Sequence, residues 1–154
     1  MRPGLTVLLT ALLLAGCGGS GDDRLTKSEF IAEADAICAK GRDHSKALPE
    51  PTTYAELAEY IRKGISIQDH DVAEIRKLKP PKNDAQDVEL MLEQVERLNA
   101  AFDRLQAAAE KGDAKGVVRR STDVRRANRA AARRARQYGL RVCGQPLKSI
   151  GDST

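Results

Sequence analysis

The sequence predicts an all-α protein, an antiparallel four-helix bundle of up-down-up-down topology that is closed by one disulfide. Four segments repeat apolar residues every three or four positions, and proline or glycine separates them. Only 3% of the 154 residues are aromatic, so we expect a core of Leu, Ile, Val and Ala, of which Leu and Ala favour helix. No segment shows the two-residue period of a strand. The length fits a single domain.

The first two helices are each expected to begin at a capping box. Thr26-Lys27-Ser28-Glu29 opens the first helix, which ends before Pro49. Its predicted core face consists of Phe30, Ala34, Ile37, Cys38, Gly41 and Leu48. Thr53-Tyr54-Ala55-Glu56 opens the second helix, and Pro80-Pro81 ends it because proline cannot donate the helical hydrogen bond. The predicted core face of the second helix is Leu57, Ile61, Ile65, Gln68, Val72, Ile75 and Leu78.

The third and fourth helices are predicted from near-heptad spacing. After Asn83-Asp84 the third helix carries Val88, Met91, Val95, Leu98, Phe102, Leu105 and Ala109 on one face. Lys111-Gly112-Asp113 forms the turn, with Asp113 as N-cap of the fourth helix. That helix has the face Val117, Ser121, Val124, Asn128, Ala131, Ala135 and Tyr138, and Gly139 is expected as its C-cap, with Leu140 folding back.

The amino terminus combines Arg2 with the apolar run Leu5–Ala15, which is too short to cross a bilayer of about 30 Å. This pattern is typical of a secretory signal. Leu14-Ala15-Gly16-Cys17 resembles the lipobox of bacterial lipoproteins. The resemblance implies that residues 1–16 are removed and that Cys17 carries a diacylglycerol. The protein would then be anchored on the extracytoplasmic face of the bacterial cell membrane, with residues 17–25 as a flexible tether. The alternative is an ordinary secreted protein whose discarded signal contains Cys17.

Two cysteines remain in the mature chain, Cys38 and Cys143, near its opposite ends. Because export leads to an oxidising compartment, we expect a disulfide between them. Two free thiols are the alternative, and a metal site is less favoured because the spacing lacks any CxxC or neighbouring His. The helical bundle is expected over residues 26–143 and a disordered tail over residues 144–154.

The ends of the mature chain contain two short motifs, Phe30–Cys38 and Tyr138-Gly139-Leu140-Arg141-Val142-Cys143-Gly144. Together they resemble small actinobacterial exported lipoproteins of unknown function, in which an alanine-rich helix ending in Ile-Cys opens the domain. The match covers only the two ends. The resemblance supports the Cys38–Cys143 pairing and implies no catalytic residue.

Positive charge is concentrated in the last helical segment. Residues 114–143 carry a net charge of +9, whereas residues 17–113 carry −6. On the third helix Glu89, Glu96, Asp103 and Glu110 recur every seven residues and form one acidic stripe. One interpretation pairs this stripe with arginines of the fourth helix; the other leaves a surplus that contacts anionic lipid or wall polymers. The candidate residues for that contact are Arg119, Arg120, Arg126, Arg129, Arg133, Arg134 and Arg136.

Two polar residues fall on predicted core faces, Gln68 and Asn128. A hydrogen-bonded polar layer that fixes the helix register explains them, and a pocket for a small ligand is the alternative. The sequence predicts no catalytic residue, metal site or cofactor: His44 and His70 lie on polar faces, and no Gly-rich phosphate loop is present. Nucleic acid is not an expected partner, because no aromatic residues are interleaved with the arginines. The sequence identifies no protein partner.

Overall fold

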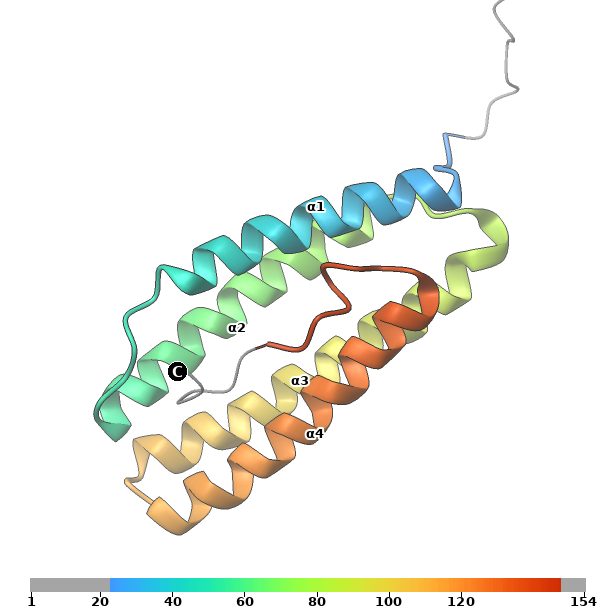
Figure 1. The fold of residues 1–154 in the computed structure, drawn as a ribbon. Coiled ribbons are helices and arrows are strands. Elements are labelled where there is room, and N and C mark those ends of the chain that lie inside the picture. Colours follow the sequence, from blue (N-terminus) through green and yellow to red (C-terminus); the bar gives the residue numbers. More distant parts are fainter. Residues whose placement is uncertain (1–22, 148–154) are drawn as a thin grey trace, which may run out of the picture.

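The computed structural model describes residues 23–147, and four long helices account for most of them (Figure 1). The helices are α1 (Lys27–Lys46), α2 (Tyr54–Lys77), α3 (Ala85–Glu110) and α4 (Ala114–Tyr138), with a short 3-10 helix η1 (Lys82–Asp84) before α3. They run antiparallel in chain order, so the predicted all-α four-helix bundle is confirmed. The predicted signal peptide, Cys17 and most of the predicted tether lie outside the described residues, as does the chain from residue 148.

The helix ends follow the predicted capping chemistry. Thr26 and Thr53 each close a capping box with the glutamate three residues later, and the Asp113 side chain accepts a hydrogen bond from the Gly116 N–H. Gly139 has a φ of 119°, a left-handed conformation that glycine adopts readily, and it ends α4. These caps set the helix limits, because each satisfies backbone groups that the helix itself leaves unpaired.

The packing differs from a closed bundle on one side. α3 packs most extensively on α4, then on α2, and α1 packs on α2. α1 and α4 meet where Phe30 contacts Tyr138, and elsewhere the C-terminal segment 139–147 folds back and lies between them (Figure 1). Most of the packing between these two helices therefore runs through this segment.

The C-terminal segment is held to α1 by a disulfide and a carboxylate. Cys38 and Cys143 are bonded, with 5.3 Å between their Cα atoms, as predicted. The Asp35 carboxylate accepts hydrogen bonds from the backbone N–H groups of Arg141, Val142 and Cys143 at 2.8–3.0 Å. Three backbone donors that the turn leaves unpaired are thus satisfied by one side chain.

Two arginines hold the carbonyl groups of the same segment. Arg42 of α1 donates to the Val142 carbonyl at 3.0 Å and to the Gln145 carbonyl, and Arg136 of α4 donates to the Gly144 carbonyl. Burial lowers the pKa of the Arg42 guanidinium, and the negative charge of Asp35 counteracts this. A tail that was expected to be disordered from residue 144 is therefore bonded to the bundle as far as residue 147.

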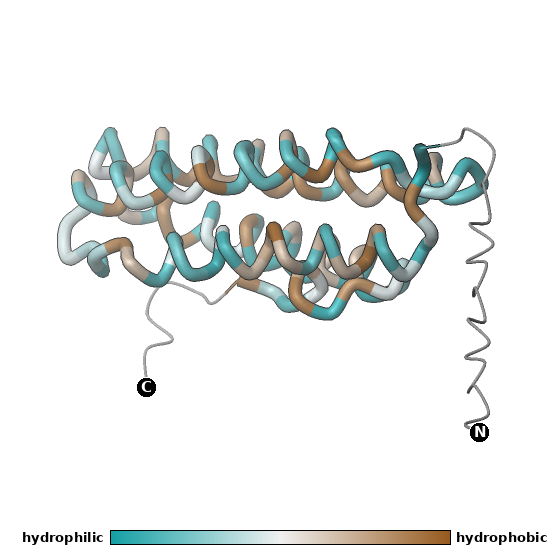
Figure 2. The backbone as a smooth tube through the Cα atoms, turned by 90° about the horizontal axis from the view of Figure 1, so that it is seen from above, coloured by the Kyte–Doolittle hydropathy of each residue, from teal (hydrophilic) through white to brown (hydrophobic). Residues whose placement is uncertain are grey.

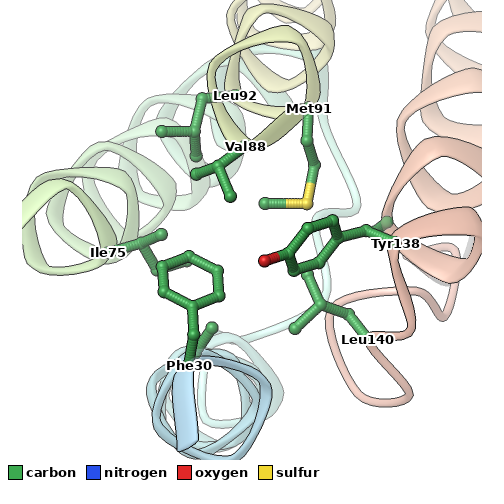
Figure 3. Close-up of a cluster of buried hydrophobic side chains, with 9 residues drawn as sticks. Phe30, Ile75, Val88, Met91, Leu92, Tyr138 and Leu140 are labelled. Atoms are coloured by element: carbon green, nitrogen blue, oxygen red, sulfur yellow. The ribbon is translucent and has the colours of Figure 1, made fainter. Parts of the chain in front are cut away.

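The core consists of two apolar clusters along the bundle axis. One cluster brings together all four helices and the C-terminal segment: Phe30, Ile75, Val88, Met91, Leu92, Tyr138 and Leu140 (Figure 3). Within it the Phe30 and Tyr138 rings meet edge to face, with centroids 5.7 Å apart. The second cluster, at the other end, contains Ile61, Leu98, Ala101, Leu105 and Val124. Leucine, alanine and other aliphatic residues dominate both, as the composition predicts.

Tyr138 also has a polar anchor at the edge of the first cluster. Its hydroxyl donates to Asp84 at 3.0 Å, and the Lys27 ammonium lies 4.5 Å from the centre of its ring. Burial and the hydrogen bond to Asp84 both raise the pKa of the Tyr138 phenol, so it stays protonated. Along each helix, hydrophobic and hydrophilic positions alternate turn by turn (Figure 2), and the buried apolar residues belong to the two clusters. Within residues 23–147, no helix combines the length and apolar character needed to cross a membrane.

Candidate functional site

The acidic stripe of α3 does not neutralise α4. Glu89 and Glu96 form ion pairs with Arg76 of α2, at 3.3 and 2.8 Å, and Glu110 accepts a hydrogen bond from Gln106 of its own helix. No ion pair within residues 23–147 joins the stripe to α4. For residues 23–147 the interpretation that pairs the stripe with the arginines of the fourth helix is therefore wrong, since Glu89 and Glu96 pair with α2 instead.

The seven arginines singled out from the sequence are divided by the structure into engaged and open side chains. Arg120 pairs with Asp123 at 3.2 Å, Arg134 pairs with Asp87 of α3 at 2.8 Å, and Arg136 holds the Gly144 carbonyl. The other four are exposed and have no acidic partner within 4 Å in the described part of the chain: Arg119, Arg126, Arg129 and Arg133. Much of the positive charge of α4 therefore stays in solvent.

A groove runs between α3 and α4 on the outer side of this helix pair, and we call it the α3–α4 groove. Its larger part has a volume of about 460 Å³ and its smaller part about 240 Å³, and both parts contact Arg104 and Arg120. The cationic residues that line it are Arg97, Arg104, Lys111, Arg119, Arg120 and Arg126. The apolar residues that line it are all alanines: Ala101, Ala107, Ala108, Ala127 and Ala130.

Small residues explain why a groove forms here. Ala101, Ala108 and Gly116 are buried where α3 meets α4, so the two backbones approach closely. The long arginine side chains stand on either side of this seam and form the walls. Lys and Arg lay their apolar stems along such surfaces while their charged ends remain in water.

The electrostatics of the groove favour an anion. Two carboxylates line it, Asp113 and Asp123, against six cations. Asp113 caps α4 by accepting from the Gly116 N–H at 2.9 Å, and Asp123 is paired with Arg120. Arg97 has only a long contact of 3.8 Å to Glu93. Arg104, Lys111, Arg119 and Arg126 have no acidic partner within 4 Å among residues 23–147.

The basic residues on the α3 side of the groove were not predicted from the sequence. Arg97, Arg104 and Lys111 are spaced by seven residues, as are Arg119 and Arg126 on α4. Residues seven apart share a helix face, so the first three form a basic row on α3. This seven-residue spacing is visible in the sequence. Residues 17–113 carry a net charge of −6, however, so a basic row was not expected in this part of the chain.

The two alternative pocket residues, Gln68 and Asn128, differ in their hydrogen bonding. The Asn128 side chain donates to the Leu147 carbonyl at 2.9 Å and accepts from the Leu147 N–H at 3.0 Å, so both of its polar atoms are engaged. The side-chain oxygen of Gln68 is buried and has no hydrogen-bond partner among the described residues. No hydrogen bond between described residues joins Gln68 to Asn128. Asn128 therefore fixes the C-terminal segment in register along α4.

The histidines lie away from the groove. His44 and His70 are both exposed, near Asp71, which is half-buried where α1 crosses α2 at Gly41. Burial raises the pKa of Asp71, and the positive charges of His70 and His44 oppose that rise. No three His, Cys, Asp or Glu side chains of residues 23–147 gather as a metal site.

The fold and the groove define the class of protein: an antiparallel four-helix bundle, closed by a disulfide, with a basic groove along one helix pair. Comparison with models of protein families, with curated proteins and with solved structures finds no match to this chain.

Proposed function

We propose that this protein is an exported lipoprotein without enzymatic activity, a binding or envelope-structural module that contacts anionic surfaces of the cell envelope. A diacylglycerol on Cys17 anchors it to the extracytoplasmic face of the bacterial membrane. The observation that carries the proposal is the set of cations along α3 and α4 that have no acidic partner in the described chain. Two of the acids that were expected to neutralise them, Glu89 and Glu96, pair with Arg76 of α2 instead.

Simple charge physics supports an anionic partner. Each Lys or Arg near an anionic surface contributes about 1 kcal/mol to binding. Arginine suits phosphate in particular, because its planar guanidinium offers paired N–H donors. Several side chains acting together on one face are enough for affinity that falls steeply with salt.

The attachment of the amino terminus is compatible with a lipid anchor. The Leu25 N–H bonds to the Lys79 carbonyl at 2.8 Å, and Arg24 donates to the Pro80 carbonyl at 3.1 Å. The chain therefore enters the bundle at the end where α2 connects to α3. Residues 17–22, with no apolar face, would link this end to the membrane.

The anchor is tested by intact mass and fractionation in the native host. We expect the mass of residues 17–154 plus acyl chains, a gain of two protons on reduction, and loss of membrane retention in a Cys17→Ser variant. If high salt releases the protein from membranes and Cys17→Ser behaves identically, the lipoprotein proposal is wrong.

The anionic contact is tested with the Cys17→Ser mature chain and vesicles. We expect binding to vesicles that contain phosphatidylglycerol, a steep loss of binding as salt rises, and no binding to phosphatidylcholine alone. Equal binding to both vesicle types would contradict the proposal.

A receptor for a small ligand is the second candidate, supported by the buried side-chain oxygen of Gln68, which has no hydrogen-bond partner among the described residues. It requires the C-terminal segment to leave Asn128. A ligand-dependent rise in Tm that persists after charge reversal on α4 would favour it.

A further inference from the structure

We infer that the α3–α4 groove binds an extended polyol-phosphate chain, a linear phosphodiester polymer that lies along the groove between two rows of cations. This inference rests on the proposed contact with anionic envelope surfaces and names the ligand class of that contact. It is carried by the arrangement of the cations, by the alanine lining of the groove and by its distance from the expected anchor.

The cations are arranged in two rows along antiparallel helices. Arg97, Arg104 and Lys111 form the row on α3, and Arg119 and Arg126 form the row on α4. At 1.5 Å per residue, the row from Arg97 to Lys111 is about 21 Å long. A linear chain with a charge in each repeat meets cations from both sides along that length. A single phosphate reaches only a few of them.

The shape of the groove favours a linear polymer as ligand rather than a flat membrane surface. Its volume of about 460 Å³ in the larger part lies between the rows, over Ala101, Ala127 and Ala130. A flat bilayer surface contacts only the outermost tips of the arginines and leaves this volume unfilled. A narrow flexible chain enters it and receives guanidinium groups on either side, where charge-assisted hydrogen bonds to phosphate are strongest.

The residues that line the groove also favour a polymer without nucleobases. None of the residues that line the groove is aromatic. Proteins that hold single-stranded nucleic acid stack its bases on aromatic side chains, and each stacked base adds to the affinity. A polyol phosphate needs no such platform, because its polymer offers charge and small apolar carbons that match the cations and alanines here.

The position of the groove separates it from the membrane that holds the anchor. Arg97 follows the first residue of α3 by 12 positions, which is about 18 Å along the helix, and Lys111 lies about 39 Å along it. Both distances are measured from the end at which the chain enters. They exceed the screening length of about 8 Å at physiological salt, so an upright bundle presents the groove to a polymer above the bilayer.

The test uses two double variants of the Cys17→Ser mature chain that remove the same charge. R104Q with R126Q removes two groove cations that have no acidic partner in the described chain, so neither change breaks an ion pair. R125Q with R129Q removes two arginines of α4 that do not line the groove. The probes are long poly(glycerol phosphate), a fragment shorter than about 20 Å, vesicles with phosphatidylglycerol, and a single-stranded oligonucleotide of equal charge.

We expect the long polymer to bind more tightly than the short fragment and the oligonucleotide. The groove variant should lose about 30-fold in affinity for the long polymer, and the control variant less than about 3-fold. Circular dichroism and Tm of both variants should match the parent, since all four side chains are exposed.

Each other outcome overturns the inference in a distinct way. Equal losses in both variants would show that total charge, not the groove, governs binding. Tightest binding to the oligonucleotide would assign the groove to nucleic acid. Binding to vesicles but not to the polymer would overturn the inference and leave the proposed function intact, whereas binding to none of the probes would overturn both.

Discussion

Asp35 is the residue on which the C-terminal segment depends most. It is the only acceptor described for the backbone N–H groups of Arg141, Val142 and Cys143. An unpaired buried donor costs about 1–3 kcal/mol, and Val142 and Cys143 are partly buried. Nothing in the sequence pattern marks Asp35, because an aspartate in a helix usually faces solvent.

We therefore expect Asp35→Ala to lower the free energy of unfolding by about 2 kcal/mol with the disulfide intact. Urea denaturation of the oxidised protein measures this. Glu33→Ala is the control, since Glu33 is exposed on the same helix and its loss should change the stability by less than about 0.5 kcal/mol. Equal effects of the two substitutions would contradict the role of Asp35.

Alanine substitutions at two glycines are expected to change the stability of the protein in opposite directions. A Cβ at Gly144 would lie 2.5 Å from the Leu140 carbonyl oxygen and 3.2 Å from the Arg136 nitrogen, and backbone atoms cannot move aside easily. Gly64 lies inside α2 with nothing within 4 Å of its Cβ position. Gly64→Ala should stabilise the protein by about 0.5–1 kcal/mol, and Gly144→Ala should destabilise it by about 1–3 kcal/mol. Thermal unfolding distinguishes the two, and a gain in Tm for Gly144→Ala would show that the segment repacks freely.

Asp71 makes the stability depend on pH. Burial raises its pKa in the folded state, so the folded protein holds that proton more tightly than the unfolded chain does. Its contribution to stability is therefore present below the ordinary aspartate pKa of about 3.9 and is lost as the pH rises through the higher folded value. Asp71→Asn should be more stable than the parent at pH 7, by up to about 1 kcal/mol after allowing for solvent exposure, and similar to it near pH 3.

Urea denaturation at several pH values measures this difference. Asp103→Asn is the control, because it removes the same charge from an exposed side chain. If the Asp71→Asn difference is the same at both ends of the pH range, the burial of a charge at Asp71 is not its cause.

At the scale of elements, capping signals and apolar spacing predict all four helices, and the two cysteines left in an exported chain predict the disulfide. Thr26, Thr53, Asp113 and Gly139 cap helices as expected, because capping depends only on neighbours in the chain. The path of segment 139–147 is less predictable. It depends on tertiary hydrogen bonds that Asp35 and Asn128 accept from backbone N–H groups 107 and 19 residues further along the chain.

The same segment makes α1 the helix that depends most on the disulfide. α1 packs directly on α2, and apart from the contacts of Phe30 and Lys27 with Tyr138 it is joined to α4 through the C-terminal segment. Removing a disulfide that closes a loop of about 100 residues costs about 2–5 kcal/mol. We expect the Cys38→Ser, Cys143→Ser double variant to lose that much stability.

Hydrogen exchange in this double variant should rise first in α1 and in residues 139–147, while the α3–α4 pair stays protected. Arg42 and Asp35 lose their fixed partners when the segment is free to leave. A uniform rise in exchange across all four helices would show that the disulfide acts only through the unfolded chain.

At the scale of the whole molecule, the sequence locates the positive charge but not the groove. The surplus on α4 follows from counting residues 114–143. The groove also needs Arg97 and Arg104 of α3, whose helix is acidic overall on its α2 side. Only the way α3 packs against α4 in the folded bundle shows which charged row of α3 lies beside the arginines of α4. The residue spacing within one helix does not encode this packing.

The Cys38–Cys143 bond also makes the chain a covalent ring. It joins positions 105 residues apart, so α2, α3, α4 and the turns between them all lie within the closed loop. A protease that cuts the exposed, proline-containing connection 47–53 leaves both new ends attached through the bond. A single cut in that connection would therefore release no part of the bundle until the disulfide is reduced.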